Sequence, residues 1–126
     1  MSLRCLLVDD NSAFLEIARL ILEREGMLVV GSATTGAEAL RLAESLAPDV
    51  ALVDVDLGAE SGLDLVEPLV RGRDDRLRVI LMSSYDESDF RELVAGSAAV
   101  GFLPKTSLSA AAIEELLGPA GAMGQP

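Results

Sequence analysis

The chain has 126 residues, of which 50% are hydrophobic, and its net charge at pH 7 is −11. This length is typical of one domain, and the hydrophobic content is high enough for a core without cross-links, which excludes an intrinsically disordered chain. The acidic charge argues against direct contact with nucleic acid, because phosphates are bound by lysine and arginine.

Cysteine, histidine and long apolar stretches are scarce in this sequence. Cys5 is the only cysteine and lies in an apolar run, so we expect a buried side chain and no internal disulfide. With no histidine and one cysteine, a zinc site has almost no ligands to use. No stretch approaches the ~20 apolar residues that cross a bilayer, and no signal peptide opens the chain. We therefore predict a cytoplasmic protein without a membrane segment.

The N-terminal part predicts a strand, a helix and a second strand. The apolar run Leu3–Val8 predicts the first strand, and Asn11 or Ser12 can cap the helix that follows. Gly26 is expected to end this helix, and Met27–Val30 predicts the second strand. The helix is expected to bury a face made of Phe14, Ile17, Ala18, Ile21 and Leu22.

The middle part repeats the alternation of helix and strand. Thr35 with Glu38 three residues later forms a capping box for a second helix, and the run Val50–Val53 predicts the third strand. Pro48 ends the second helix, and Ser61 can cap a third. The buried faces are expected to carry Gly36, Ala39, Leu40, Ala43 and Ala47 in the second helix, and Gly62, Leu65, Val66, Leu69 and Val70 in the third.

The C-terminal part completes five strands and five helices. Pro68 should kink or shorten the third helix, because it removes a backbone hydrogen bond. Val79–Met82 and Val100–Leu103 predict the fourth and fifth strands, and Asp86–Ala95 predicts a short helix between them. Strict alternation of buried strands and helices predicts an α/β fold with a parallel sheet covered on both faces. The short helix is expected to bury Phe90, Leu93 and Val94, and the last helix starts at Ser107 or Ser109 and carries Ala111, Ala112, Leu116 and Leu117.

Polar side chains collect where the predicted strands end. Ligands of an open parallel sheet bind outside the carboxyl ends of the strands. If the strand order is 2-1-3-4-5, the first and third strands are neighbours and their terminal carboxylates form one cluster. The residues at these ends are Asp9 and Asp10 after the first strand, Ser32 in the second, Asp54 after the third, Ser83 and Ser84 after the fourth, and Lys105 after the fifth.

The predicted acidic cluster favours a hard cation. Three carboxylates close together repel one another, so some must be protonated or a cation must lie among them. Oxygen ligands without histidine or cysteine suit Mg²⁺. A metal beside a carboxylate indicates phosphoryl transfer onto that carboxylate, with Lys105 and Ser83 able to stabilise the phosphoryl oxygens.

Each of these residues also has an ordinary structural explanation when it is taken alone. Asp9 and Asp10 could cap a helix, and Asp54 could be a loop acid. Lys105 could be a solvated surface residue, and the serines could cap the next helix. Their shared position at the ends of alternating units favours one functional site.

The order and spacing of these motifs resemble the receiver domain of two-component response regulators, which has the flavodoxin-like, doubly wound fold with strand order 2-1-3-4-5. The resemblance extends from Leu6 to about Leu117. It rests on Asp9-Asp10, Asp54, the spacing from Asp54 to Gly62, Ser83-Ser84 and the segment Gly101-Phe102-Leu103-Pro104-Lys105.

The resemblance implies roles for the acids. Asp54 would accept a phosphoryl group from a phosphohistidine of a sensor histidine kinase. Asp10 would bind Mg²⁺ directly, Asp9 through water and Asp56 through its backbone carbonyl, with Asp54 completing the metal site. The resemblance implies a signalling receiver rather than an enzyme. The domain would take up a phosphoryl group and slowly lose it again.

The resemblance also implies a switch. Lys105 would pair with the phosphoryl oxygens, and the hydroxyl of Ser83 would turn inward to bond them. Phe102 matches the aromatic position whose ring moves between exposed and buried states. Such a change is a shift between two populations that make different contacts.

Three positions depart from the usual pattern of the family. Gly58 stands where proline is usual, which predicts a looser loop after Asp54. Thr106 follows the lysine where proline is common, and a cis peptide bond before threonine would cost about 3 kcal/mol. Phe102 lacks a tyrosine hydroxyl, so a switch at this position would work by packing alone. Asp56 and Tyr85 stand at positions that tune phosphoryl lifetime in the family.

The segment Gly101–Ile113 is similar to receivers that carry a C-terminal helix-turn-helix output domain. We therefore expect residues 1–117 to be a receiver domain of a transcriptional regulator and residues 118–126 to be a flexible tail or the start of a linker. Output would be by protein contact, with a homodimer on phosphorylation as one form, and without nucleic acid or membrane contact by this domain.

Two alternatives remain at this stage. The first is a receiver-like interaction module that is never phosphorylated, although such modules usually lose an acid or the lysine, and this chain has both. The second is a phosphatase of the haloacid dehalogenase type, because Asp54-Val55-Asp56 resembles its paired acids. That motif normally ends the first strand and is followed two residues on by threonine or valine, where this chain has Gly58.

Overall fold

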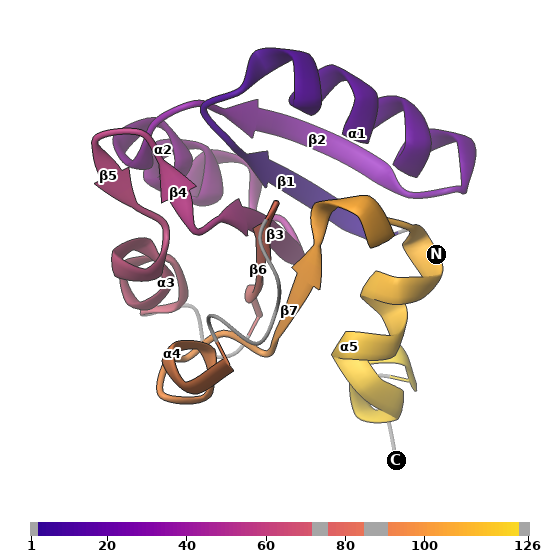
Figure 1. Cartoon of the computed structure of the whole chain (residues 1–126). Helices are drawn as coiled ribbons and strands as arrows, with labels where there is room; N and C mark the ends of the chain where they lie inside the picture. Colours follow the sequence, from indigo (N-terminus) through magenta and orange to yellow (C-terminus); the bar gives the residue numbers. More distant parts are fainter. Residues whose placement is uncertain (1–2, 72–75, 85–90, 124–126) are drawn as a thin grey trace.

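The computed structural model describes residues 3–71, 76–84 and 91–123. Its centre is a five-stranded parallel sheet, in which the strands lie in the order β2-β1-β3-β6-β7 (Figure 1). These are the five predicted strands in the predicted order, so the flavodoxin-like topology is confirmed. The strands are β1 (Arg4–Val8), β2 (Leu28–Ala33), β3 (Val50–Asp54), β6 (Arg78–Ser83) and β7 (Gly101–Pro104).

Helices cover both faces of the sheet. In Figure 1, α1 and α5 lie on one face, and α2, α3 and α4 lie on the other. Among the described residues, no helix is long and apolar enough to cross a bilayer. The helices are α1 (Ser12–Arg24), α2 (Gly36–Leu46), α3 (Leu63–Val70), α4 (Arg91–Ala95) and α5 (Ala110–Met123), and a short 3₁₀ helix, η2, spans Lys105–Ser107.

Two apolar clusters form the core, one on each face of the sheet. Alternate residues of a strand point to opposite faces, so Leu6 and Val8 pack under α2 and α3, whereas Cys5 and Leu7 pack under α1 and α5. This explains why the strands read as continuous apolar runs. Cys5 is fully buried as predicted, and burial raises the pKa of its thiol to about 12. The thiol is therefore not reactive at neutral pH.

Side-chain caps begin α1, α2 and α5 at predicted positions, whereas α3 begins after Gly62, the residue that follows the predicted cap Ser61. The side chain of Asn11 accepts hydrogen bonds from the backbone N–H groups of Ala13 and Phe14. Thr35 accepts from the N–H of Glu38, while Glu38 accepts from the N–H of Thr34, one residue before the usual capping-box position. The Ser109 hydroxyl accepts from the N–H of Ala112 at the start of α5. Of the two predicted caps of the last helix, Ser109 is the one used.

Three residues predicted on buried helix faces are exposed instead. Ile17 is 55% exposed and Leu93 is 55% exposed, and Ala47 ends α2 in a left-handed conformation on the surface. In α1 the buried positions are Leu15, Ala18 and Leu22, because the helix is rotated toward Leu15 relative to the predicted face. The apolar residues of a short helix cover more than one face, so periodicity alone did not fix this rotation.

A small hairpin that the sequence analysis missed follows the third strand. β4 (Asp56–Leu57) pairs antiparallel with β5 (Glu60–Ser61). Gly58 and Ala59 form the two-residue connection, and Gly58 has a φ of +78°. A glycine with positive φ at the first position of a two-residue turn is typical of tight hairpins. The loop is therefore a defined turn, and a proline, with φ near −65°, could not adopt it.

The C-terminal helix extends past the predicted boundary of the domain. Its backbone continues to Met123, with a break at Gly118, where φ is 79° and ψ is 169°. The proposed tail, residues 118–126, begins at this break. The expectations for Tyr85, Phe90 and the first turn of the Asp86–Ala95 helix lie outside the described residues.

Candidate functional site

The register of the sheet brings the predicted site residues to one edge. Val8 lies opposite Val53, so Asp9 follows β1 beside the place where β3 ends at Asp54. Ser83 lies opposite Pro104, one residue before Lys105. The four residues come from strand ends that are neighbours in the sheet and far apart in sequence.

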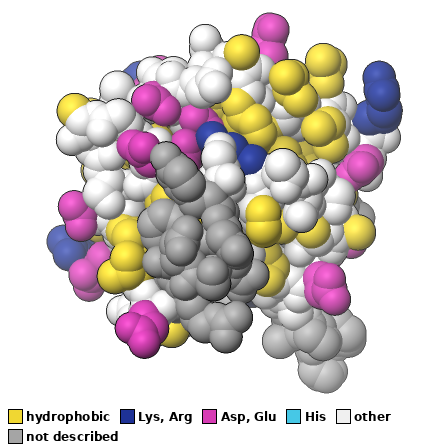
Figure 2. Space-filling model, viewed as in Figure 1, with side chains coloured by type: hydrophobic (Ala, Val, Ile, Leu, Met, Phe, Trp, Pro, Cys, Tyr) yellow, Lys and Arg dark blue, Asp and Glu magenta, His cyan; other side chains and the backbone are white. Residues whose placement is uncertain are grey.

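Three carboxylates of this edge form one cluster. Oxygen atoms of Asp9, Asp10 and Asp54 all lie within 4.8 Å of one another. Asp9 is completely buried, Asp54 is 6% exposed, and Asp10 is on the surface. Grouping three acids in this way is costly unless a cation compensates their charge. On the face drawn in Figure 2, acidic side chains gather beside a basic group.

Lys105 supplies part of that compensation. Its Nζ lies 2.6 Å from Asp9 Oδ2 and donates a hydrogen bond of 2.9 Å to Asp54 Oδ2. Burial alone would lower the pKa of Lys105, but its contacts with Asp9 and Asp54 outweigh burial and raise the pKa. The lysine is therefore charged at neutral pH and bridges the two buried acids. The side chain is 14% exposed, so it is not a solvated surface lysine.

Opposing electrostatic effects act on the pKa of Asp54. Burial raises the pKa of its carboxyl group, and the charge of Asp9 acts in the same direction. A 3.1 Å hydrogen bond from the Asp56 N–H to Asp54 Oδ1 and the contact with Lys105 offset only part of this effect. The net pKa is raised, so ionised Asp54 is held in the folded protein at a cost that a further cation would relieve.

This balance predicts how stability depends on pH. Because the folded pKa of Asp54 lies above its unfolded value, the folded state binds the proton more tightly, and stability falls as pH rises from the unfolded pKa through the folded one. The variant Asp54→Asn has no such penalty. In metal-free buffer its free energy of unfolding, relative to that of the wild type, is expected to increase as the pH is raised from the ordinary pKa of an aspartate side chain to neutrality. Denaturant titrations across this range measure it, and a difference that does not change with pH would contradict the expectation.

The remaining predicted residues lie around this centre in different ways. Ser83 is buried at the end of β6, and Phe102 is buried within β7, one strand away. Ser84 is exposed. Asp56 is also exposed, and its carboxylate accepts a hydrogen bond from the Gly58 N–H rather than joining the acidic cluster. The predicted metal contact of Asp56 through its backbone carbonyl stays a prediction.

The two unusual loops are well defined. A Cβ added to Gly58 would lie 3.0 Å from Asp10 Oδ2, so the hairpin turn packs directly against the acidic cluster. Glu60, at the other end of the turn, accepts hydrogen bonds from the Gly36 N–H at the start of α2. The loop after Asp54 is thus anchored on two sides rather than loose. In the second loop, the peptide bond between Lys105 and Thr106 is trans.

The sequence pattern predicts for Phe14 only a position on a buried helix face. The structure adds that its ring lies under the ammonium of Lys105, with Nζ 4.5 Å from the ring centroid. Nothing in the sequence pattern could have paired them, because they are 91 positions apart and are joined only by tertiary packing.

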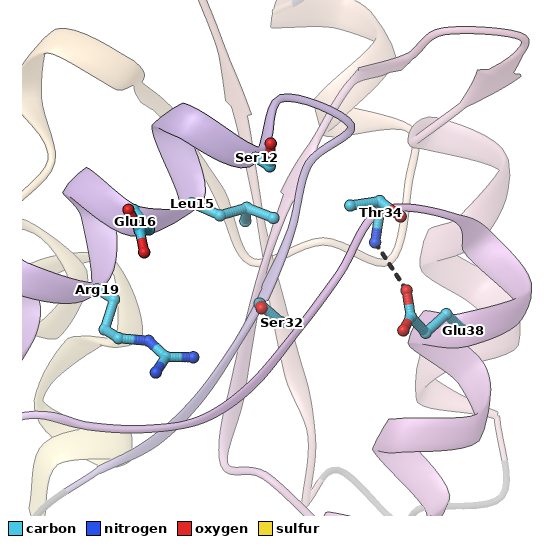
Figure 3. A pocket seen from close by; sticks show the side chains of 7 residues that line it. All are labelled: Ser12, Leu15, Glu16, Arg19, Ser32, Thr34 and Glu38. Carbon is cyan, nitrogen blue, oxygen red and sulfur yellow. Dashed lines mark hydrogen bonds between the residues drawn. The ribbon is translucent and has the colours of Figure 1, made fainter.

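A polar groove lies between the start of α1, the end of β2 and the start of α2 (Figure 3). Its volume is about 410 Å³, and its lining includes Ser32 but none of the clustered acids and not Lys105. Ser32 therefore belongs to this groove and not to the acidic centre. The lining residues are Ser12, Leu15, Glu16, Arg19, Ser32, Thr34 and Glu38.

Among known protein families, the response regulator receiver domain matches this chain over residues 5–117. The response regulator GacA of Pseudomonas aeruginosa is 32% identical over 116 residues, which are 91% of this chain and 52% of that protein. The transcriptional regulatory protein LiaR of Bacillus subtilis is 30% identical over 109 residues, which are 86% of this chain and 51% of LiaR. The chain thus spans about half the length of these curated relatives.

Solved structures agree with this match. The signal receiver domain of a Mycobacterium tuberculosis response regulator described as NarL has a TM-score of 0.78 and 32% identity, covering 93% of this chain and 98% of that one. A response regulator from Burkholderia pseudomallei, solved with a phosphorylated aspartic acid, a calcium ion and citrate, has a TM-score of 0.80 and 28% identity. That alignment covers 98% of this chain and 71% of the other.

Proposed function

The chain belongs to the family of response regulator receiver domains, and on that premise we propose that it accepts a phosphoryl group on Asp54 from a sensor histidine kinase. The observation that carries the proposal is the contact of Lys105 Nζ with both Asp9 and Asp54 inside a cluster of three acids. This geometry supplies a nucleophilic carboxylate and a cation for the phosphoryl oxygens in one place.

The acidic cluster fits a divalent cation. Asp9 Oδ2 is buried, and its close polar partner among the described residues is the Lys105 ammonium at 2.6 Å. An oxygen-only donor set is what Mg²⁺ prefers. Side chains of Asp9, Asp10 and Asp54, with the carbonyl of Asp56, would hold the ion. When bound, it supplies positive charge that neutralises the phosphoryl oxygens and the attacking carboxylate.

In the proposed reaction, an oxygen of Asp54 attacks phosphorus. A new P–O bond forms, the P–N bond to the kinase histidine breaks, and the histidine leaves with the electron pair. The Asp56 N–H orients Asp54 through Oδ1, so Oδ2 is the oxygen that Lys105 contacts in the unphosphorylated protein. Lys105 then pairs with the phosphoryl oxygens. Loss of the phosphoryl group to water would return the domain to its starting state.

We propose that phosphorylation of Asp54 changes the position of Ser83 and, through it, the position of Phe102. Ser83 lies at the end of β6 next to β3, and Phe102 lies in the neighbouring strand β7. A phosphoryl group on Asp54 would draw the Ser83 hydroxyl inward. The ring of Phe102 would then repack into the space that the hydroxyl leaves, and this repacking would change the surface that partners contact. With relatives such as GacA and LiaR as the guide, we propose that residues 1–117 are the receiver of a transcriptional regulator and residues 118–126 begin a connecting segment.

The proposal is tested with the wild-type protein, Mg²⁺ and a small acyl phosphate such as acetyl phosphate. Intact-protein mass spectrometry is expected to show the addition of one phosphoryl group, and chelation of Mg²⁺ by EDTA is expected to prevent it. Binding of Mg²⁺ is measured separately by titration. A protein that binds Mg²⁺ but takes up no phosphoryl group would overturn the proposal.

Other outcomes of the same experiment would favour the alternatives. A protein that neither binds Mg²⁺ nor takes up a phosphoryl group would be a receiver-like interaction module. Steady release of phosphate from an external phosphate ester over many turnovers would indicate a phosphatase. The position of Asp54 at the end of β3, in the middle of the sheet, already differs from the first-strand position of the phosphatase motif.

A further inference from the structure

Lys105 is the only lysine of the chain, and three side chains lie against its ammonium group. Two sides of its ammonium are closed by carboxylates, at 2.6 Å from Asp9 Oδ2 and 2.9 Å from Asp54 Oδ2. A third side faces the ring of Phe14, whose centroid lies 4.5 Å from Nζ. The face of an aromatic ring carries negative charge density, so this contact attracts the ammonium.

The three contacts respond differently to a divalent cation. Asp9 and Asp54 both belong to the cluster that fits Mg²⁺, so a bound ion would compete with Lys105 for the same carboxylates. The ring of Phe14 is uncharged and half-buried on α1, beside the cluster rather than within it. It is therefore the partner that Lys105 can keep when its ionic partners are shared with a metal.

We propose that Phe14 is a positioning residue for Lys105: its ring face holds the ammonium beside Asp54 when the carboxylates bind a divalent cation. This inference rests on the proposed function of Asp54 and adds a residue to it. Without the ring, a long lysine side chain released from Asp9 gains rotamer freedom and is free to turn toward solvent. The ammonium of Lys105 would then no longer lie where it can pair with the phosphoryl oxygens.

The first test measures the contact itself and does not require phosphorylation. Isotope-labelled lysine gives a single set of side-chain NMR signals, because the chain has one lysine. A ring face so close is expected to move the ε-methylene signals of Lys105 upfield, both in metal-free protein and after addition of Mg²⁺. In Phe14→Leu the signals are expected to lose this shift. Signals that are unshifted in the wild type, or that lose the shift when Mg²⁺ binds, would overturn the proposal.

The second test measures the consequence for the reaction. Mono-, di- and trifluorinated phenylalanine at position 14 keep the shape of the ring and progressively remove its negative face. The rate of phosphoryl uptake from acetyl phosphate is expected to fall stepwise along this series, by about two- to fivefold at the end of the series. Phe14→Trp is expected to retain the wild-type rate, and Phe14→Leu to match the trifluorinated protein.

The two proposals fail in different ways. If the wild type takes up no phosphoryl group, the proposed function fails, whatever the NMR signals show. If the wild type is phosphorylated at the same rate as the trifluorinated and Leu variants, Asp54 keeps its function and the positioning role of Phe14 is wrong. Thermal unfolding of each variant shows whether a slow rate reflects a loss of folded protein, and the trifluorinated ring settles the question if the Leu variant is unstable.

Discussion

The variant Asp54→Asn is expected to take up no phosphoryl group from an acyl phosphate or a sensor kinase. An amide keeps the size of the side chain and its hydrogen bond from the Asp56 N–H, but it lacks the nucleophilic carboxylate oxygen. The loss should be complete rather than partial, because no other described acid combines burial with contact to both Asp56 N–H and Lys105 Nζ. Intact-mass measurement in the presence of Mg²⁺ detects it directly.

A matched control separates this effect from a general loss of negative charge. Asp64→Asn makes the same chemical change at an exposed position on α3, away from the acidic cluster, and is expected to be phosphorylated at the wild-type rate. Peptide mapping of the labelled wild type should place the modification at residue 54. Labelling that persists in Asp54→Asn would move the acceptor to another acid, with Asp10 as the neighbour to examine first.

The variant Gly62→Ala is expected to have the largest effect on folding. A Cβ at this position would lie 1.9 Å from the carbonyl oxygen of Asp54 and 3.0 Å from the Cα of Val55. Both are backbone atoms of a buried segment, so the clash cannot be relieved by turning a side chain. The N–H of Gly62 also donates to the Val55 carbonyl at 2.9 Å, which fixes the close approach. We expect a loss of at least about 3 kcal/mol in the free energy of unfolding, measured by urea titration.

Two other glycines provide graded controls for this variant. Gly96 has ordinary van der Waals space, 3.5 Å from the nearest atom, and Gly96→Ala is expected to be close to neutral. Gly26 has a φ of +95° but open space around it, so Gly26→Ala should cost about 1 to 2 kcal/mol from backbone strain alone. A Gly62→Ala protein as stable as Gly26→Ala would show that the Asp54 loop can move aside. It would contradict the expectation that the backbone at Gly62 is held close to the Asp54 carbonyl.

Much of the fold follows from local patterns. Continuous apolar runs identified all five strands, because a strand that is covered on both faces has no polar side to display. The caps Asn11, Thr35 and Ser109 marked helix starts because their short side chains can bond free N–H groups. The rotation of α1 was predicted incorrectly, since Ile17 and Leu15 are both apolar and only packing against the sheet selects between them. The β4–β5 hairpin was missed because strands of two residues have no periodicity.

The position of Asp9, Asp10, Asp54, Ser83 and Lys105 at one edge of the sheet could be predicted from the sequence, because all five follow or end predicted strands and parallel strands bring their carboxyl ends to one edge. The contacts between these groups could not be predicted, because they depend on tertiary packing. The bridge from Lys105 to Asp9 and Asp54 and the ring of Phe14 beneath it depend on how α1 and the β7–α5 connection pack on the sheet. The raised pKa of Asp54 has the same origin, because burial and charge depend on distances between residues far apart in the chain.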